Sequence, residues 1–149
     1  MEKERQDKSM KKEKLKTQKI PKDAIYATGK RKCAIAKVWL FSGKGSVNIN
    51  GLDFKDYLKR DYLVHHINEA LKELNLLEKY DVIAKALGGG ITGQAEAIRL
   101  GVAKALVIMD DNFKKPLREK GLLTRDSRIK ERKKYGRRGA RKRPQYRKR

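Results

Sequence analysis

The segment 88–93 carries the most recognisable chemical motif in this sequence. It reads Gly-Gly-Gly-Ile-Thr-Gly, which satisfies the G-x-G-x-x-G pattern of dinucleotide-binding proteins, and Asp110 and Asp111 follow at a plausible distance. That pattern belongs at the first turn of a parallel sheet, with several further strand–helix units behind it. The residues after Asp111 are strongly basic and contain no further strand pattern. We therefore reject a dinucleotide site.

The physical properties of this glycine segment nevertheless suit a phosphate group. Glycines let a phosphate approach the backbone closely, and a helix N-terminus offers free amide hydrogens with partial positive charge. Gly88, Gly89, Gly90 and Gly93 are therefore candidate contacts for an RNA phosphate. The alternative is that these glycines only turn the chain between a strand and a helix, and the two roles are compatible.

A second candidate is the basic run Lys30-Arg31-Lys32, which follows Gly29 and lies between two predicted strands. Three successive cations at a strand end or in a loop would project toward phosphate oxygens. The alternative is an ordinary solvated charged loop.

Other residue types give no convincing site. His65 and His66 have no cysteine or acidic partner at metal-ligand spacing, so we interpret them as partly exposed helix residues. Cys33 is the single cysteine, which excludes an internal disulfide, and its apolar neighbours predict a small buried side chain. No catalytic triad, carboxylate pair or P-loop can be assembled, so we expect neither enzymatic activity nor a cofactor.

The charge of the chain points to a polyanionic partner. The 149 residues have a formal net charge of +22, and residues 128–149 contribute thirteen basic side chains against one acid. Nucleic acid would neutralise this self-repulsion. A nuclear localisation signal or a solubilising tail are alternative interpretations of the tail. There is no run of eighteen apolar residues, no signal peptide and no acid-poor transit peptide, so we expect a cytoplasmic protein without membrane association.

The middle of the chain predicts one small α/β domain. Strand patterns cover 25–28, 34–41, 46–50 and 80–87. In the second of these, Ile35, Lys37, Trp39 and Phe41 alternate with smaller aliphatic residues, so one of the two faces must be core.

Helical spacing covers 53–59, 62–77 and a segment that begins near Thr92 and ends before Asp110. Shorter helical candidates are 116–121 and 126–134, the second with Asp126 as its possible N-cap. The tail beyond has no apolar spacing and should be extended until RNA orders it. We therefore divide the chain into a basic N-terminal extension (1–24), a globular domain (25–127) and a basic tail (128–149).

Three blocks of the sequence together resemble one known family. They are Thr28–Ala36, Gly88–Leu106 and the ending Arg141–Arg149, and on these residues the chain is similar to bacterial members of the small-subunit ribosomal protein S9 family. The resemblance runs from about Ile25 to the last residue, and the block from Gly88 is far more specific than basic composition. The first twenty or so residues lie outside it, and we expect them to be disordered or to lie loosely on RNA.

The resemblance implies an α+β fold, a two-layer α/β sandwich like the second domain of ribosomal protein S5 and like some kinases. It also implies a position in the head of the small subunit, in contact with ribosomal RNA and neighbouring ribosomal proteins, and no homo-oligomer. The expected ribosomal RNA contacts are Lys30, Arg31, Lys32, Gly88, Gly89, Gly90, Gly93, Gln94, Arg99, Arg125, Arg128, Arg132, Lys133, Lys134, Arg137, Arg138, Arg141, Lys142 and Arg143.

The end of the tail is expected to reach the anticodon stem-loop of transfer RNA in the peptidyl site. By position, the contacts would be Arg147, Lys148 and Arg149. The family usually has serine where this chain has Arg147, so a charged contact to phosphate would replace a serine hydrogen bond. Two rivals stay open on the residues alone: a DNA-binding architectural protein, and a small nucleotide-dependent enzyme built on the glycine segment.

Overall fold

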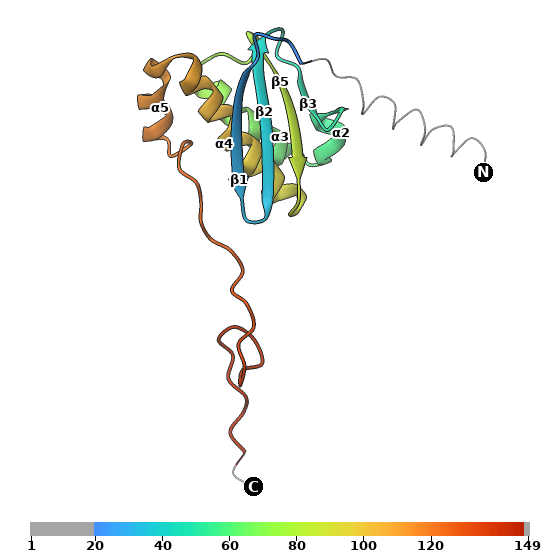
Figure 1. The fold of residues 1–149 in the computed structure, drawn as a ribbon, viewed down its shortest axis with the longest axis vertical. Helices are drawn as coiled ribbons and strands as arrows, with labels where there is room; N and C mark the ends of the chain where they lie inside the picture. The colour runs from blue at the N-terminus through green and yellow to red at the C-terminus, as the bar shows by residue number, and fades with distance from the viewer. Residues whose placement is uncertain (1–19, 148–149) are drawn as a thin grey trace, which may run out of the picture.

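The fold is a five-stranded sheet with helices packed on one of its faces, as the computed structural model shows for residues 20–147 (Figure 1). Residues 1–19, which make up most of the expected N-terminal extension, lie outside the described residues, as do Lys148 and Arg149. The strands are β1 (Ile25–Arg31), β2 (Ala34–Ser42), β3 (Val47–Ile49), β4 (Leu52–Asp53) and β5 (Tyr80–Leu87). The helices are α2 (Phe54–Leu58), α3 (Asp61–Glu73), α4 (Ile91–Met109), the 3-10 turn η1 (Asp111–Phe113) and α5 (Lys114–Glu119).

The sheet is mixed, with the strand order β1-β2-β5-β3-β4. The pairs β1/β2 and β2/β5 are antiparallel, whereas β3 and β5 are parallel. This arrangement confirms the predicted mixed α+β fold. An antiparallel centre is also incompatible with the parallel sheet of dinucleotide-binding proteins, which agrees with the rejection of that site.

The alternation along β2 is resolved by the position of the helices. Ala36, Val38 and Leu40 are fully buried, whereas Ile35 and Lys37 are exposed on the opposite face. The small aliphatic face is therefore the core face, since it allows a helix to approach the sheet closely.

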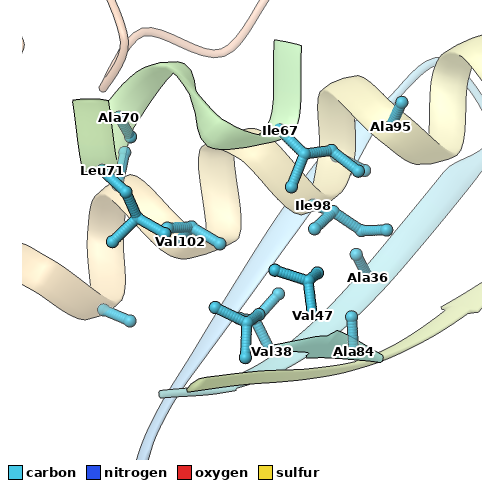
Figure 2. Packing of buried hydrophobic residues seen from close by; sticks show 14 of the residues in the cluster. Ala36, Val38, Val47, Ile67, Ala70, Leu71, Ala84, Ala95, Ile98 and Val102 are labelled. Atoms are coloured by element: carbon cyan, nitrogen blue, oxygen red, sulfur yellow. The ribbon is translucent and has the colours of Figure 1, made fainter. Parts of the chain in front are cut away.

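Helix α4 is the centre of the core. Figure 2 shows Ile98 and Val102 of this helix between the sheet residues Val38 and Val47 and the α3 residue Ile67, and all five are buried. The helix carries apolar or small residues around most of its circumference, as expected for a helix covered on two sides.

Two glycines let α4 lie directly against the sheet. A Cβ atom at Gly29 of β1 would stand within 3 Å of backbone atoms of Ala97 and Gly101, and one at Gly101 would stand 2.6 Å from Val38 Cγ2. No side chain fits at either position without separating helix and strand, so both glycines are needed for packing.

Two expectations about the local structure of the tail root and of the β1–β2 turn were wrong. The helix predicted over 126–134 does not form, because the segment has no apolar stripe to bury and Ile129 stays exposed. Cys33 is exposed rather than buried, because it lies with Lys32 in the tight turn between β1 and β2. From Thr124 to Arg147 the chain has no regular structure and extends away from the body, as predicted for the tail (Figure 1).

Candidate nucleic-acid interface

The first two glycines of the segment 88–93 are required by the backbone. Gly88 and Gly89 have φ angles of +71° and +59°, and a Cβ atom at Gly88 would lie 2.6 Å from the carbonyl oxygen of Cys33. Gly90 has no such constraint, since its φ is −110° and a Cβ there would meet nothing within 4 Å. At Gly93 a Cβ would make only ordinary contacts, at 3.6 Å. The tight turn therefore explains two of the four glycines and leaves Gly90 and Gly93 for another role.

The N-terminus of α4 is open to an anion. Its N-cap residue, Gly90, provides no side-chain cap, and the first turn has no acidic residue. A cavity of about 400 Å³ lies in front of it, lined by Lys32, Cys33, Gly89, Gly90, Ile91, Thr92, Gly93, Ile129 and Lys130. Free amide hydrogens between two lysines form an environment that favours a phosphate. Lys130 was not among the predicted contacts. Nothing in the sequence around Lys130 indicates that it lies beside the start of α4.

Gln94 is used by the protein itself. Its Nε2 atom donates to the carbonyl oxygen of Gly88 at 3.0 Å, and its Oε1 atom accepts from the Tyr57 hydroxyl at 2.6 Å. Asn50 in turn donates to the Tyr57 hydroxyl and pairs with both backbone groups of Ala86. This network holds the glycine turn against the end of β5, so the structure gives Gln94 an internal bracing role.

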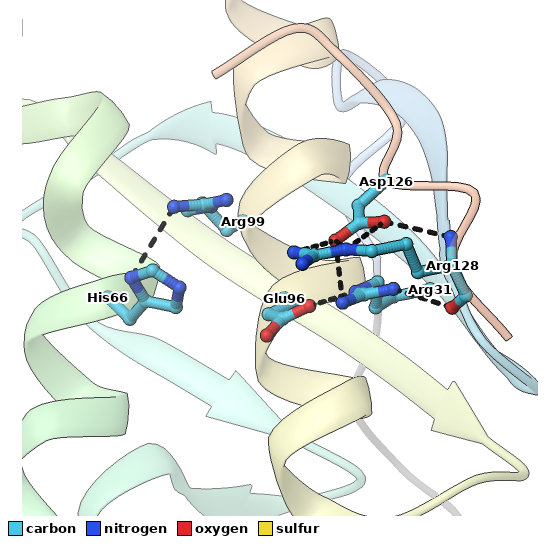
Figure 3. A network of polar contacts seen from close by, with 6 residues as sticks. All are labelled: Arg31, His66, Glu96, Arg99, Asp126 and Arg128. Carbon is cyan, nitrogen blue, oxygen red and sulfur yellow. Dashed lines mark hydrogen bonds and ion pairs between the residues drawn. The ribbon is translucent and has the colours of Figure 1, made fainter. Parts of the chain in front are cut away.

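Arg31 is buried rather than projecting into solvent, contrary to the expectation for the run 30–32. Strand β1 continues through Arg31, whose side chain points to the helical face and is 10% exposed. It pairs with Glu96 of α4, its Nη2 atom lies 2.7 Å from Asp126 Oδ2, and its Nη1 atom donates to the carbonyl oxygen of Arg128 at 2.9 Å (Figure 3). Arg31 therefore joins the first strand, the central helix and the root of the tail, and its charge is already neutralised.

The carboxylate of Asp126 is shared by two arginines. Arg128 approaches it with its side chain at 2.7 Å and with its backbone amide at 2.8 Å. Hydrogen bonds from the Arg128 side chain, then from its amide, hold the pKa of Asp126 well below its ordinary value of 3.8, with a smaller effect of the Arg31 charge. Because the folded-state pKa is lowered, this contribution to stability is complete above about pH 4 and is lost only as the pH falls toward the lower value.

Arg99 links the two long helices. Its Nη1 atom lies 2.8 Å from Glu69 Oε2 of α3 and 3.4 Å from Nδ1 of His66, and its Nε atom is buried without a hydrogen-bond partner. His66 is about one-third exposed, as predicted. Arg99 is therefore engaged within the fold, away from the glycine turn.

The remaining predicted cations lie at the surface. Lys30 and Lys32 are exposed at the β1–β2 end, and Arg125 is exposed just before the tail. The exposed predicted cations of the tail are Arg128, Arg132, Lys133, Arg138, Arg141, Lys142, Arg143 and Arg147. Lys134 and Arg137 are half-buried within the tail. Glu131 pairs with Lys134 and Arg141, and the backbone amide of Arg138 donates to the carbonyl oxygen of Lys142. These contacts fold the middle of the tail into a loop.

Comparison with known proteins identifies the family. A model of the family described as "Ribosomal protein S9/S16" matches residues 29–149. The chain belongs to this family. It is 54% identical to the small ribosomal subunit protein uS9 of Cytophaga hutchinsonii, over 85% of this chain and 99% of that protein. It is also 54% identical to uS9c of Mesostigma viride (82% and 90%) and 51% identical to uS9 of Helicobacter hepaticus (84% and 98%).

Membership of the S9 family confirms the resemblance found in the sequence and makes the chain a ribosomal protein rather than an enzyme. Within residues 20–147, no helix is both long and apolar enough to cross a membrane. The same part of the chain contains no group of three His, Cys, Asp or Glu residues that could hold a metal ion.

Proposed function

We propose that this S9-family protein is a structural constituent of the small ribosomal subunit that anchors its body on ribosomal RNA of the head and extends its tail toward peptidyl-site transfer RNA. The observation that carries the proposal is the arrangement around Arg31: a folded body fixes the root of a long tail of exposed cations. The relatives' names as small ribosomal subunit proteins support the small-subunit part of this proposal. The protein would act on cytoplasmic ribosomes, beside other proteins of the head.

Ribosomal RNA would meet this protein in two ways. The cavity at the N-terminus of α4 offers backbone amides flanked by Lys32 and Lys130, which suits a single phosphate. The tail offers many separate cations, which suits neutralisation of closely spaced phosphates in folded RNA. Both kinds of contact position the protein without reading bases. Tyr135 and Tyr146 are almost fully exposed and are available to stack on unpaired bases.

The placement is tested by sedimentation of the tagged protein on sucrose gradients at moderate and at high salt. Co-migration with small subunits is expected at both salt concentrations, because the sum of many phosphate contacts gives an affinity high enough to survive the loss that added salt causes. A slow peak free of ribosomal RNA at both salts would contradict the proposal.

The role of the tail end is tested by replacing Arg147, Lys148 and Arg149 with three glutamines. Ribosomes with this variant should assemble normally but hold peptidyl-site transfer RNA more weakly, by roughly tenfold for the loss of charged phosphate contacts. The matched control replaces Lys104, Lys114 and Lys115, which lie exposed on α4 and α5, and should retain transfer RNA normally. Equal transfer RNA affinity in both kinds of ribosome would refute this role.

A further inference from the structure

One face of the sheet is covered by no helix among the described residues. In Figure 1 the strands β1, β2 and β5 lie in front of α4 and α3, so the uncovered face is turned toward the viewer. Alternation along the strands places a mixed set of cationic, aromatic and apolar side chains there. We call this surface the open face, and its main residues are Tyr26, Lys30, Lys37, Trp39, Lys85 and Leu87.

The centre of the open face is positively charged. Lys37 of β2 and Lys85 of β5 are direct cross-strand partners, and Lys30 of β1 stands diagonally from Lys37. Like charges directly opposite each other destabilise a sheet, since their Cβ atoms are only about 5 Å apart. Among the ion pairs of residues 20–147 none involves these lysines, so no carboxylate there compensates the repulsion.

Aromatic and apolar side chains flank these lysines on both sides. The rings of Tyr26 and Trp39 are 5.4 Å apart, and the Lys85 ammonium group lies 5.7 Å from the centre of the Trp39 ring. Tyr26 is 46% exposed, and Leu87 at the other end is 68% exposed. The open face therefore presents exposed apolar surface beside unpaired positive charge.

The acid that shares this face of β5 with Lys85 is already engaged. Asp81 lies farther along β5 and accepts hydrogen bonds from the backbone amides of Lys44 and Ser46, at 2.9 and 2.7 Å. It fixes the loop before β3 and does not face the lysines in register, since its partner on β2 is Phe41.

We propose that the open face binds an unpaired segment of RNA, with phosphates against Lys30, Lys37 and Lys85 and a base against the Tyr26 and Trp39 rings. The inference rests on the proposed function, because ribosomal RNA is the RNA in question. A strand of RNA supplies negative charge and flat apolar bases at alternating positions, which is the complement of this surface. An acidic protein segment would satisfy the lysines but would leave the aromatic pair without a matching group.

Trp39 gives a direct readout, because it is the single tryptophan of the chain. The full-length protein is titrated with single-stranded oligouridine, and the fluorescence of Trp39 is followed. Binding at the open face should quench this fluorescence, whereas binding through the distant tail should not. Affinity is obtained from the quenching at several salt concentrations. In the variant with both Lys37→Gln and Lys85→Gln, the slope of log affinity against log salt should fall in magnitude by about 1.4, which is about 0.7 for each lost phosphate contact. Tyr26→Leu should weaken binding about fivefold or more through lost stacking.

The matched control is the double variant Lys104→Gln and Lys115→Gln, which removes the same charge from α4 and α5 and should behave as wild type. Polyglutamate serves as the acidic protein probe and should quench Trp39 less than oligouridine does, because it has no base to stack on the rings. Absence of quenching by RNA, an equal effect of both double variants, or equal quenching by polyglutamate would each overturn the proposal. The sucrose-gradient experiment, combined with chemical footprinting of the RNA in the small subunits, separates the open-face proposal from the proposed ribosomal function. If the Lys37→Gln/Lys85→Gln variant enters small subunits and protects the same RNA positions as wild type, only the open-face proposal is refuted.

Discussion

At the scale of single residues, Arg31 shows how far a position in sequence can mislead. It lies in a run of three cations, and in the sequence it is indistinguishable from Lys30 and Lys32. Strand alternation turns only Arg31 inward, where Glu96 and Asp126 receive it. Its guanidinium group can hold two carboxylates and a carbonyl oxygen at once because its donors diverge in a rigid plane, which a lysine cannot reproduce.

Replacement of Arg31 by alanine should destabilise the protein. The change leaves the half-buried carboxylates of Glu96 and Asp126 without this partner, and we expect a loss of about 1–3 kcal/mol in the free energy of unfolding. Urea denaturation followed by circular dichroism measures it. Lys30→Gln, one position earlier on the exposed side, should stay within about 0.5 kcal/mol of wild type. Equal stability of the two variants would mean that the Arg31 contacts contribute nothing.

At the scale of elements, the sequence predicted most of the fold because its periodicities are strong. The helical spacing of 62–77 and of the segment after Thr92 predicted α3 and α4, although α3 ends four residues earlier, at Glu73. The strands other than the two-residue β4 followed from β-prone runs separated by glycine turns. Alternation in β2 predicted two unlike faces but not which one is core, because that depends on where α4 packs. The contacts of Arg31 with Asp126 and of Gln94 with Tyr57 join distant segments, and no local pattern specifies them.

The glycine turn allows its structural and binding roles to be separated. Gly90→Ser should raise the stability slightly, by about 0.5 kcal/mol, because serine caps a helix N-terminus better than glycine. The serine hydroxyl accepts a hydrogen bond from a free amide of the helix and fills part of the space in front of it, where the phosphate would bind. Affinity for small-subunit ribosomal RNA should therefore fall roughly tenfold. Thermal unfolding and filter binding measure the two effects.

Gly89→Ala should change the stability in the opposite direction from Gly90→Ser. Its φ of +59° and a Cβ 3.0 Å from Ala34 should cost about 1–2 kcal/mol of stability. Unchanged RNA affinity in Gly90→Ser would mean that the segment only turns the chain.

At the scale of the whole molecule, the body and the tail differ in composition and in contacts. The apolar core lies within the body, and all contacts of Arg31 involve residues up to Arg128. Residues 132–149 contain eleven cations and no acid. In the proposed function, the tail would therefore contribute electrostatic affinity for RNA, and the body would contribute fixed geometry.

A chain that ends after Lys130 should keep the melting temperature of the full-length protein, because the Arg31 contacts and the cavity at α4 are retained. Its affinity for ribosomal RNA should become much less salt-dependent, since each lost phosphate contact removes about 0.7–0.9 from the slope of log affinity against log salt. Binding at several salt concentrations measures the slope. An unchanged slope would place the RNA contacts in the body alone.

In the proposed function, the attachment of the tail root to Arg31 would also set the local concentration of the tail at its RNA target. Once the body is docked, the tail starts from a fixed point on its surface, and its binding becomes an intramolecular event. A shorter free tether gives a higher effective concentration, since this concentration falls as roughly the −3/2 power of tether length. Fixing the chain at Asp126 and Arg128 therefore shortens the search of the remaining residues for their partner, without any additional contact to RNA.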